Sequence, residues 1–374
     1  MSSEITVVRE PGAEWASGYF APTLVQARSY HIDTPQVAIK LDQNESPVDW
    51  PIEYKRRVCD ALIERPWNRY PTPYPVQLAE MVARYAGVPS HENLILGPGS
   101  NYIITLVMDA LCHRLKGDVV ITRPSFPLYE NHAAYSGIPY KTWELNGNLE
   151  YDLALIPDLR PGSVVLFASP NNPVGNSLSS KDLDTLLHRH PDSIFVADEA
   201  YFEFSDDPYT PLLSKHGNLL ILRTFSKALG AAGVRLGYVM GAKTLLDQIR
   251  KLRLPYLINQ FALVAASMVL ESQEMGAFFE KTVEMIKTER DRVFNSVKAL
   301  SAEGGFAVKP TQANFILLRW PNSDAAGRVY QGMISRGVLV RNVSGAPSMA
   351  GCLRVTISNQ QENDHFLRAL QASL

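Results

Sequence analysis

The sequence is poor in cysteine and has no long apolar run. Its three cysteines, Cys59, Cys112 and Cys352, are widely spaced and form no C-x-x-C pair. This spacing argues against a disulfide framework or a cysteine-based zinc site, and it fits a reducing, cytoplasmic setting. The amino terminus, "MSSEITVVREPGAEW", carries acids and a proline where a signal peptide needs an apolar core. No apolar segment approaches membrane-spanning length, so we expect a soluble protein.

The sequence also lacks a strong charge of either sign. A formal net charge of −2 and the absence of a clustered basic stripe argue against a nucleic-acid surface, because neutralising phosphates requires concentrated Lys and Arg. We therefore expect a small molecule as the partner. The eight histidines are scattered, and the close pair His188 and His190 lies in "LHRHPD", which is typical of an exposed helix end. The sequence indicates no metal site.

Short apolar runs alternate with amphipathic segments over most of the chain. The runs are rich in β-branched residues and lack the alternation of a half-exposed strand, so they predict strands buried on both faces. They are "NLIL", "DVVITRP", "SVVLFASP", "SIFVADEA", "LLILRTFS" and "LGYVMG". Segments such as "NYIITLVMDALCHRL" repeat apolar residues at helical spacing. The alternation predicts an α/β fold, with a mostly parallel sheet flanked by helices on both sides.

The carboxyl-terminal third of the chain has a different pattern. A long helical stretch from about Phe261 to Leu300 precedes three strand-like runs, "ANFILLRW", "GVLVRN" and "CLRVTIS". These runs predict a smaller α+β unit. We therefore expect a large ligand-binding domain over residues 48–270, with residues 1–47 and 271–374 forming an amino-terminal arm and a small domain.

Polar residues follow five predicted strands, at the carboxyl ends where open parallel sheets bind ligands. The first end is "GPGSN", Gly97 to Asn101, which opens a helix. Its glycines allow close backbone approach and the free amides favour an anion, although glycine turns also join strands to helices without any ligand. The second end places Phe126 where a planar ring can stack. The third, "NNPVG", offers the amides of Asn171 and Asn172, which equally suit a plain turn.

The fourth and fifth ends carry an acid and a lysine. Asp198 and Tyr201 lie in "VADEAY", and an acid there also suits the metal-binding strand of a P-loop ATPase. That alternative requires G-x-x-x-x-G-K-[ST], which the sequence does not contain, and Gly97 and Gly99 lack the third glycine of a dinucleotide fingerprint. The fifth end, "RTFSK", places Lys227 among hydroxyl groups, where a lysine can form an imine with an aldehyde.

One cofactor requires all of these groups together. Pyridoxal phosphate has a phosphate, a flat ring, a phenolic oxygen, a pyridine nitrogen and an aldehyde. We expect Asp198 to keep the ring nitrogen protonated, because an adjacent anion favours the cation, and Lys227 to bond the aldehyde. Tyr201 and Asn172 suit the ring oxygen, and Phe126 suits one ring face. The residues expected at the phosphate are Gly99, Ser100, Asn101, Thr224, Ser226 and Arg235.

Several longer motifs run from about Leu41 to Leu370. They are "LDQNESP", "NRYP", "GPGS", "SPNNPVG", "DEAYFEF", "RTFSKALGAAGVRLGY", "LPYLIN" and "GVLVRNVSGAPSMAGCLRVTIS". With these motifs the sequence resembles the fold-type I pyridoxal-phosphate enzymes of aminotransferase class I/II. It is most similar to the histidinol-phosphate aminotransferases, a likeness carried by the closing "VRN…GCLR".

The resemblance implies a homodimer in which Tyr70 reaches the cofactor phosphate of the neighbouring subunit. It places Arg354 at a substrate anion, with Arg341 and Asn44 as further substrate contacts, whereas a strand arginine otherwise often pairs with a surface acid. The implied activity is ping-pong transfer of an amino group between an amine, L-histidinol phosphate, and 2-oxoglutarate or glutamate. Lys227 would act as anchor and acid–base group, with Asp198 and Tyr201 assisting.

Other activities remain open on the same cofactor residues. Many relatives place acids where this chain has Asn101 and Tyr102, and "TISNQQEN" replaces a more usual glycine after the strand. These departures leave open an aromatic or specialised amino-acid aminotransferase of secondary metabolism. A pyridoxal-phosphate decarboxylase of the threonine-phosphate type would share every cofactor residue. A regulator that binds the cofactor without catalysis would need an added DNA-binding segment, which we do not find.

Overall fold

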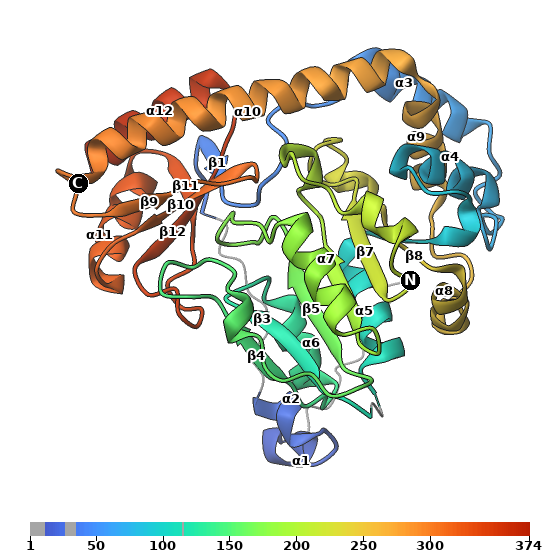
Figure 1. Cartoon of the computed structure of the whole chain (residues 1–374). Coiled ribbons are helices and arrows are strands. Elements are labelled where there is room, and N and C mark those ends of the chain that lie inside the picture. The colour runs from blue at the N-terminus through green and yellow to red at the C-terminus, as the bar shows by residue number, and fades with distance from the viewer. Residues whose placement is uncertain (1–11, 27–34, 114–115) are drawn as a thin grey trace.

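The chain folds around two β-sheets, with one long helix lying across both (Figure 1). The structure is a computed structural model that describes residues 12–26, 35–113 and 116–374. Residues 1–11 and 27–34 of the expected amino-terminal arm, and Arg114 and Leu115 of the expected helix, lie outside the described residues. Within the described part of the chain, no helix is both long and apolar enough to cross a membrane.

The larger sheet has seven strands in the order β2-β8-β7-β6-β5-β3-β4. Their bounds are β2 Leu94–Gly97, β3 Val119–Arg123, β4 Lys141–Glu144, β5 Val164–Ala168, β6 Ile194–Asp198, β7 Leu219–Thr224 and β8 Gly237–Gly241. Six of these strands match the predicted apolar runs, and β4, which is short and partly polar, was not predicted. Strand β8 runs in the direction opposite to that of the other six strands. The mostly parallel sheet of the predicted α/β class is therefore confirmed.

Helices cover both faces of this sheet because successive strand residues point to opposite sides. In β3, Val120 lies in one core, whereas Val119 and Ile121 lie in the other. The first core takes residues from α3 Ile52–Ile63, α4 Val76–Ala86, α7 Ser180–Arg189 and α9 Gln260–Glu271. The second takes residues from α5 Ser100–Leu111, α6 Leu128–Tyr135 and α8 Lys243–Ile249. The continuous apolar character of the runs follows from this burial on both faces.

The smaller sheet has five strands in the order β1-β11-β12-β10-β9. Its strands are β1 Ile39–Leu41, β9 Ala307–Lys309, β10 Phe315–Arg319, β11 Val338–Asn342 and β12 Cys352–Thr356, packed with α11 Ser323–Ser335 and α12 Gln360–Gln371. The three predicted strands are confirmed, whereas β1 and β9 are three-residue strands without a clear pattern. Because β1 pairs with β11, the segment after Leu41 is held next to the larger sheet.

The helical stretch expected from about Phe261 to Leu300 is two helices rather than one. Helix α9 ends at Glu271 and α10, Gln273–Ser301, begins after Ser272, whose hydroxyl accepts a hydrogen bond from the Met275 amide. This side-chain cap satisfies an amide at the helix start and separates the two helices. Met275 and Phe279 pack in the core of the larger sheet, and Ile286 packs in that of the smaller sheet.

Short helices complete the described elements. They are α1 Ala13–Ser17, α2 Pro22–Gln26, η1 His91–Asn93, η2 Leu153–Leu155, η3 Phe202–Phe204, η4 Thr210–Ser214, η5 Ala232–Val234 and η6 Arg250–Leu252.

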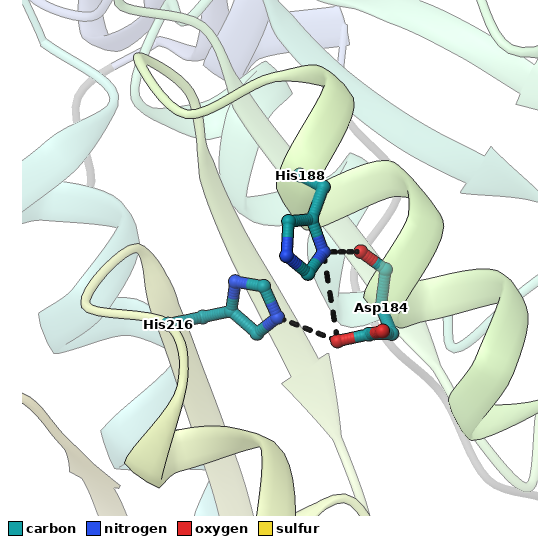
Figure 2. A group of neighbouring side chains, drawn as sticks. All are labelled: Asp184, His188 and His216. Atoms are coloured by element: carbon teal, nitrogen blue, oxygen red, sulfur yellow. Dashed lines mark hydrogen bonds and ion pairs between the residues drawn. The ribbon is translucent and has the colours of Figure 1, made fainter.

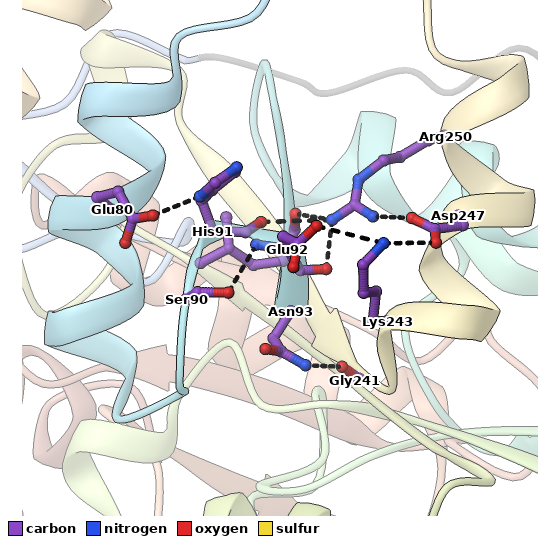
Figure 3. Close-up of polar contacts among 10 residues, drawn as sticks. Glu80, Ser90, His91, Glu92, Asn93, Gly241, Lys243, Asp247 and Arg250 are labelled. Carbon is purple, nitrogen blue, oxygen red and sulfur yellow. Dashed lines mark hydrogen bonds and ion pairs between the residues drawn. The ribbon is translucent and has the colours of Figure 1, made fainter.

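A polar network fixes the start of β2, the strand that leads into the glycine turn (Figure 3). Arg250 donates hydrogen bonds to the carbonyls of His91 and Leu94, at 3.3 and 3.0 Å, and it is ion-paired with Asp247 at 2.5 Å. His91 also contacts Glu80 of α4. The network ties η1 to α4 and α8, so the far end of β2 presents the glycine turn from a fixed position.

Candidate active site

The predicted site residues gather around one cavity of about 510 Å³. It lies where the carboxyl ends of β5, β6 and β7 face the smaller sheet, and the segment from Asp42 to Glu45 also contributes to it. Of the predicted residues, those lining the cavity are Asn44, Ser100, Asn101, Phe126, Asn172, Asp198, Tyr201, Thr224, Ser226, Lys227, Arg235, Arg341 and Arg354. Gly99 is not a lining residue but directly precedes Ser100 in the chain, and Tyr70 lies outside the cavity.

One side of the cavity is suited to an anion. Ser100 and Asn101 begin α5, where backbone amides have no partner within the helix. Thr224 and Ser226 share a hydrogen bond of 3.0 Å between their hydroxyl oxygens, and Arg235 lies 3.5 Å from the Ser226 hydroxyl. Arg235 lies shortly before the first residue of β8. Because β8 is antiparallel, its amino end lies at the edge of the sheet where the parallel strands end.

Gly99 is required by this arrangement. Its φ is +88°, a conformation that residues with side chains rarely adopt. A Cβ atom at this position would lie 2.5 Å from Nη2 of Arg235. Because glycine has no side chain, the guanidinium of Arg235 can pack directly against this turn.

Lys227 follows β7 and lies partly buried in the cavity. Its Nζ donates a hydrogen bond of 2.8 Å to the carbonyl oxygen of Gln43 and lies 6.0 Å from the centre of the Tyr201 ring. Burial lowers the pKa of Lys227 to about 8, and the positive charge of Arg354 acts in the same direction. A useful fraction of the amine is therefore neutral, and nucleophilic, near neutral pH.

Asp198, the last residue of β6, is buried beneath the cavity. Its Oδ2 accepts a hydrogen bond of 2.6 Å from the Tyr129 hydroxyl, and its Oδ1 accepts one of 3.0 Å from the Ala200 amide. Burial raises the pKa of Asp198 to about 6, and these two donors limit the rise. A cation next to this carboxylate would restore its charged state. Sequence reasoning missed Tyr129, although it lies three residues after Phe126 at the same strand end.

The remaining predicted residues are linked in pairs. The Tyr201 hydroxyl accepts a hydrogen bond of 2.9 Å from Asn44 Nδ2, and the Asn172 side-chain oxygen accepts one from Arg354. Asn171 is not among the residues that line the cavity, and its side-chain amide donates to the Pro124 carbonyl at 2.9 Å and accepts from the Ser125 hydroxyl at 2.8 Å. Of the two candidate amides in "NNPVG", Asn171 holds the turn and Asn172 faces the cavity.

Arg341 and Arg354 lie directly opposite each other on β11 and β12. Residues directly opposite on antiparallel strands project from the same face of the sheet, and both arginines line the cavity. Nη2 of Arg354 also donates a hydrogen bond of 2.6 Å to the Asp42 carbonyl. Two like charges in this register repel each other, so an anion bound between them would be stabilised.

The two predicted aromatic residues differ in their position. Phe126 lines the cavity and packs edge-on against Tyr129, with ring centroids 5.9 Å apart. Tyr70 is 81% exposed and stacks on Tyr256 at 4.8 Å, outside the cavity of this single chain.

These groups fit pyridoxal phosphate. The anion side matches the phosphate, Phe126 matches a flat ring, and the buried carboxylate of Asp198 matches a ring nitrogen that carries a proton. Lys227 supplies a neutral amine for the aldehyde. The hydrogen bonds described for Asp198 come from two neutral donors, Tyr129 and the Ala200 amide, so burial of its carboxylate is costly, and a bound pyridinium would supply a cationic partner.

Comparisons with known proteins agree with this geometry. Residues 36–370 match the family model described as aminotransferase class I and II. The histidinol-phosphate aminotransferase of Chlorobium phaeovibrioides is 36% identical over 361 residues, which cover 95% of this chain and 96% of that protein. Histidinol-phosphate aminotransferase 1 of Ralstonia nicotianae is 37% identical and is covered to 92%, as is this chain.

Solved structures share the fold. A histidinol-phosphate aminotransferase from Sinorhizobium meliloti, in complex with pyridoxal-5'-phosphate, has a TM-score of 0.79 at 22% identity, covering 94% of this chain and 96% of that one. An L-threonine-O-3-phosphate decarboxylase from Porphyromonas gingivalis has a TM-score of 0.75 at 22% identity, covering 89% and 98%. The fold alone therefore does not choose between these reactions, whereas the family model and the sequence relatives do. The chain belongs to the aminotransferase class I and II family and is a pyridoxal-phosphate-dependent transaminase.

Proposed function

We propose that this transaminase moves an amino group between L-histidinol phosphate and 2-oxoglutarate by a ping-pong mechanism. The observation that carries the proposal is the register of Arg341 with Arg354, two arginines on one face of the cavity. One substrate brings a phosphate and the other brings carboxylates, and a guanidinium pairs well with either anion. The names of the sequence relatives, which are 36% and 37% identical, support the same substrate.

In this proposal the cofactor is held from several strand ends. Ser100, Asn101, Thr224, Ser226 and Arg235, with Gly99 behind them, would bind its phosphate. Phe126 would cover one ring face, while Tyr201 and Asn172 would orient the ring through its oxygen. Asp198, itself positioned by Tyr129, would hold a proton on the ring nitrogen.

Lys227 is the proposed acid–base group. When bound, pyridoxal phosphate supplies an aldehyde and a cationic ring that accepts the electron pair of the substrate Cα–H bond. Lys227 would bond the aldehyde while no substrate is present and, once released by the incoming amine, move the proton from the substrate Cα. Its lowered pKa, about 8, places the amine near the range in which it both accepts and donates a proton.

Arg354 and Arg341 are the proposed substrate-binding groups, together with Asn44. Arg354 is already oriented by Asn172 and by the Asp42 carbonyl, which reduces the entropy lost when it binds a carboxylate. Asn44 connects the smaller sheet to the site. Its backbone N–H donates a hydrogen bond of 2.9 Å to the Thr356 hydroxyl, and its side-chain amide donates one to the Tyr201 hydroxyl.

A single-turnover spectrum tests the substrate assignment. The purified cofactor-loaded protein is mixed separately with histidinol phosphate, with aromatic amino acids and with glutamate, and the visible cofactor band is followed. We expect histidinol phosphate to bleach the band fastest and 2-oxoglutarate to restore it. If only aromatic amino acids bleach the band, the cofactor assignment is kept and the assignment of histidinol phosphate as substrate is wrong. Release of CO₂ without any need for a keto acid would instead indicate a decarboxylase.

We further propose a homodimer in which Tyr70 reaches the partner's cofactor phosphate. The support is an exposed apolar group formed by two segments, residues 52–76, which include Tyr70, and residues 252–261, which meet where Tyr70 stacks on Tyr256. Its members are Ile52, Ile63, Trp67, Tyr74, Val76, Leu252, Leu254, Tyr256 and Phe261. Exposed apolar side chains of this number in neighbouring segments are typical of a surface that binds another protein.

We also propose the division into a large domain over residues 48–270, and an arm and small domain over residues 1–47 and 271–374. Trp50 lies in the core of the larger sheet and Leu41 in that of the smaller sheet, which supports the first boundary. Helix α10 begins near the second boundary and packs against both cores.

A cytoplasmic location is the last part of the proposal. Cys59, Cys112 and Cys352 are all free thiols, and Cys112 and Cys352 are buried. Unpaired buried cysteines suit a reducing compartment.

A further inference from the structure

Three side chains with metal-ligating atoms meet outside the cavity, where α7 approaches the turn before β7 (Figure 2). Asp184 and His188 lie one turn apart on α7, and His216 follows η4. Each residue offers one ligand atom, and these three atoms all lie within 4.8 Å of one another. Among the residues that the structure describes, this is the one group of three or more such side chains found so close together.

Asp184 is the common partner of both imidazoles. Its Oδ1 lies 2.7 Å from His216 Nε2 and 3.7 Å from His188 Nδ1, and the two rings are perpendicular with centroids 4.6 Å apart. In Figure 2 the His216 ring points at this carboxylate, whereas His188 Nδ1 contacts both the carboxylate and, at 2.9 Å, the backbone carbonyl oxygen of Asp184.

We propose that Asp184, His188 and His216 bind one divalent transition-metal ion such as Zn²⁺. Two imidazoles and a carboxylate are ligands that Zn²⁺ accepts, and water would complete the coordination. With bonds of about 2.1 Å, tetrahedral ligand atoms lie roughly 3.4 Å apart, so Asp184 Oδ1 and His216 Nε2, which are 2.7 Å apart, would have to separate, and any pair near the 4.8 Å limit would have to approach. The ion would take the place of the proton between His216 Nε2 and Asp184, and that proton would pass to solvent.

The surroundings hold one ligand firmly and leave a route for the ion. The His216 side chain is 7% exposed and the His188 side chain is 68% exposed. Asn218 donates hydrogen bonds of 3.2 and 2.9 Å to the carbonyls of His190 and Ser193, so the turn is already fastened to the end of α7. Sequence spacing hides the site, because His216 comes from a different element and the neighbouring His190 instead lies near Phe195.

A metal ion here would join α7 to the segment that leads into β7. None of the three residues lines the cofactor cavity, so we expect the ion to act on stability and not on turnover. The metal site does not depend on the proposed function, so an experiment can contradict either proposal without affecting the other.

The test is calorimetric titration of the cofactor-loaded protein with Zn²⁺, after chelator treatment and removal of unbound cofactor. We expect one ion per chain and a higher unfolding temperature with Zn²⁺. His188→Gln, at an exposed position, should weaken binding by at least about tenfold and remove the thermal shift. His190→Gln, its matched control two residues along the same segment, should behave as wild type.

Cobalt provides a second measurement that reports on the ligands. Co²⁺ bound at low coordination number gives visible absorption bands, which should appear in the wild-type protein and in His190→Gln and be lost in His188→Gln. Transamination rates should be the same in all three proteins. The proposal is overturned if the wild-type protein binds neither ion at micromolar concentration, or if His188→Gln binds both ions as tightly as wild type.

Discussion

The Tyr129 hydroxyl donates a hydrogen bond of 2.6 Å to Asp198 Oδ2, and both side chains are buried. Tyr129 is the second residue of α6 and lies three residues after Phe126, so one strand end supplies both a ring-stacking residue and the donor that orients the acid. Because Tyr129 acts through Asp198, it is a positioning residue.

Tyr129→Phe should lower kcat by about tenfold, because a hydrogen bond to a charged group contributes roughly 1.5 kcal/mol or more. Losing the donor disfavours the carboxylate and raises the pKa of Asp198, so the acid limb of the kcat profile should move to higher pH. Steady-state rates from pH 5 to pH 9 measure both effects. Tyr209→Phe is the control, because its buried hydroxyl bonds to Ser169 and Leu178 rather than to Asp198. An unshifted pH profile in Tyr129→Phe would reduce its role to packing.

Asp198→Asn should stabilise the cofactor-free protein at pH 8 while abolishing efficient turnover. Burial raises the pKa of Asp198 to about 6, so the folded wild-type protein binds a proton more readily than the unfolded chain does. Wild-type stability from this group is therefore present at low pH and is lost as pH rises through about 6. The advantage of the variant should be roughly 3 kcal/mol at pH 8 and should shrink toward pH 4.

Urea unfolding of both cofactor-free proteins at pH 8, 6 and 5 measures this difference. Because all other titrating groups are shared, their contributions cancel in the comparison. Equal stability of the two proteins at every pH would show that the carboxylate carries no burial penalty.

Lys227→Ala should lower kcat by at least a factor of about 10² to 10⁴, the range expected when an acid–base group is removed. In the wild-type protein, the rate at which added cofactor bonds to the cofactor-free enzyme should rise with pH, with a midpoint near 8. The reason is that burial lowers the pKa of Lys227 to about 8, and only the neutral amine is nucleophilic. Stopped-flow absorbance at several pH values gives the midpoint. Normal turnover in Lys227→Ala would refute the assignment.

Arg341→Gln should raise KM for histidinol phosphate more than KM for an aromatic amino acid, because only the first carries a phosphate. Loss of one charge-assisted contact should cost roughly 1.5–3 kcal/mol in kcat/KM, or about 10- to 150-fold. Arg354→Gln should impair both amines, because we expect Arg354 to pair with the phosphate of histidinol phosphate and with the α-carboxylate of the amino acid. Equal losses for phosphorylated and unphosphorylated amines in Arg341→Gln would contradict a phosphate contact.

Much of the site followed from the sequence because parallel strands bring their carboxyl ends to one edge. The runs ending in Asp198 and Thr224 are apolar enough to identify as strands, and the residues after them had to meet. The direction of β8 could not be read from its apolar run. Its antiparallel course matters, since it places Arg235 at the same edge.

What the sequence did not predict depends on contacts between distant segments. Tyr129 was overlooked because an apolar helix position with a tyrosine usually indicates core packing, and only the fold brings its hydroxyl to Asp198. Likewise β1 is three residues long, yet its pairing with β11 positions Asn44. His188 is exposed, as expected for "LHRHPD", but its proximity to His216 could not be predicted because His216 is distant in sequence.

Tyr70 gives a prediction that separates action within a chain from action between chains. Tyr70→Ala and Lys227→Ala, each inactive or nearly so, are unfolded together and refolded as a mixture. If Tyr70 serves the partner's site, each mixed dimer holds one site with both residues intact, so random pairing should restore about a quarter of wild-type activity. If Tyr70 serves its own chain, every site in the mixed dimer lacks one of the two residues and activity stays low. Sedimentation of the same mixture checks that dimers form, and a monomer would contradict the proposed interface directly.

Tyr85→Ala is the matched control, because Tyr85 is also partly exposed but bonds to Glu203 of its own chain at 3.0 Å. Tyr85→Ala should be active as a homodimer of the variant alone, so recovery in the mixture can be assigned to Tyr70 itself.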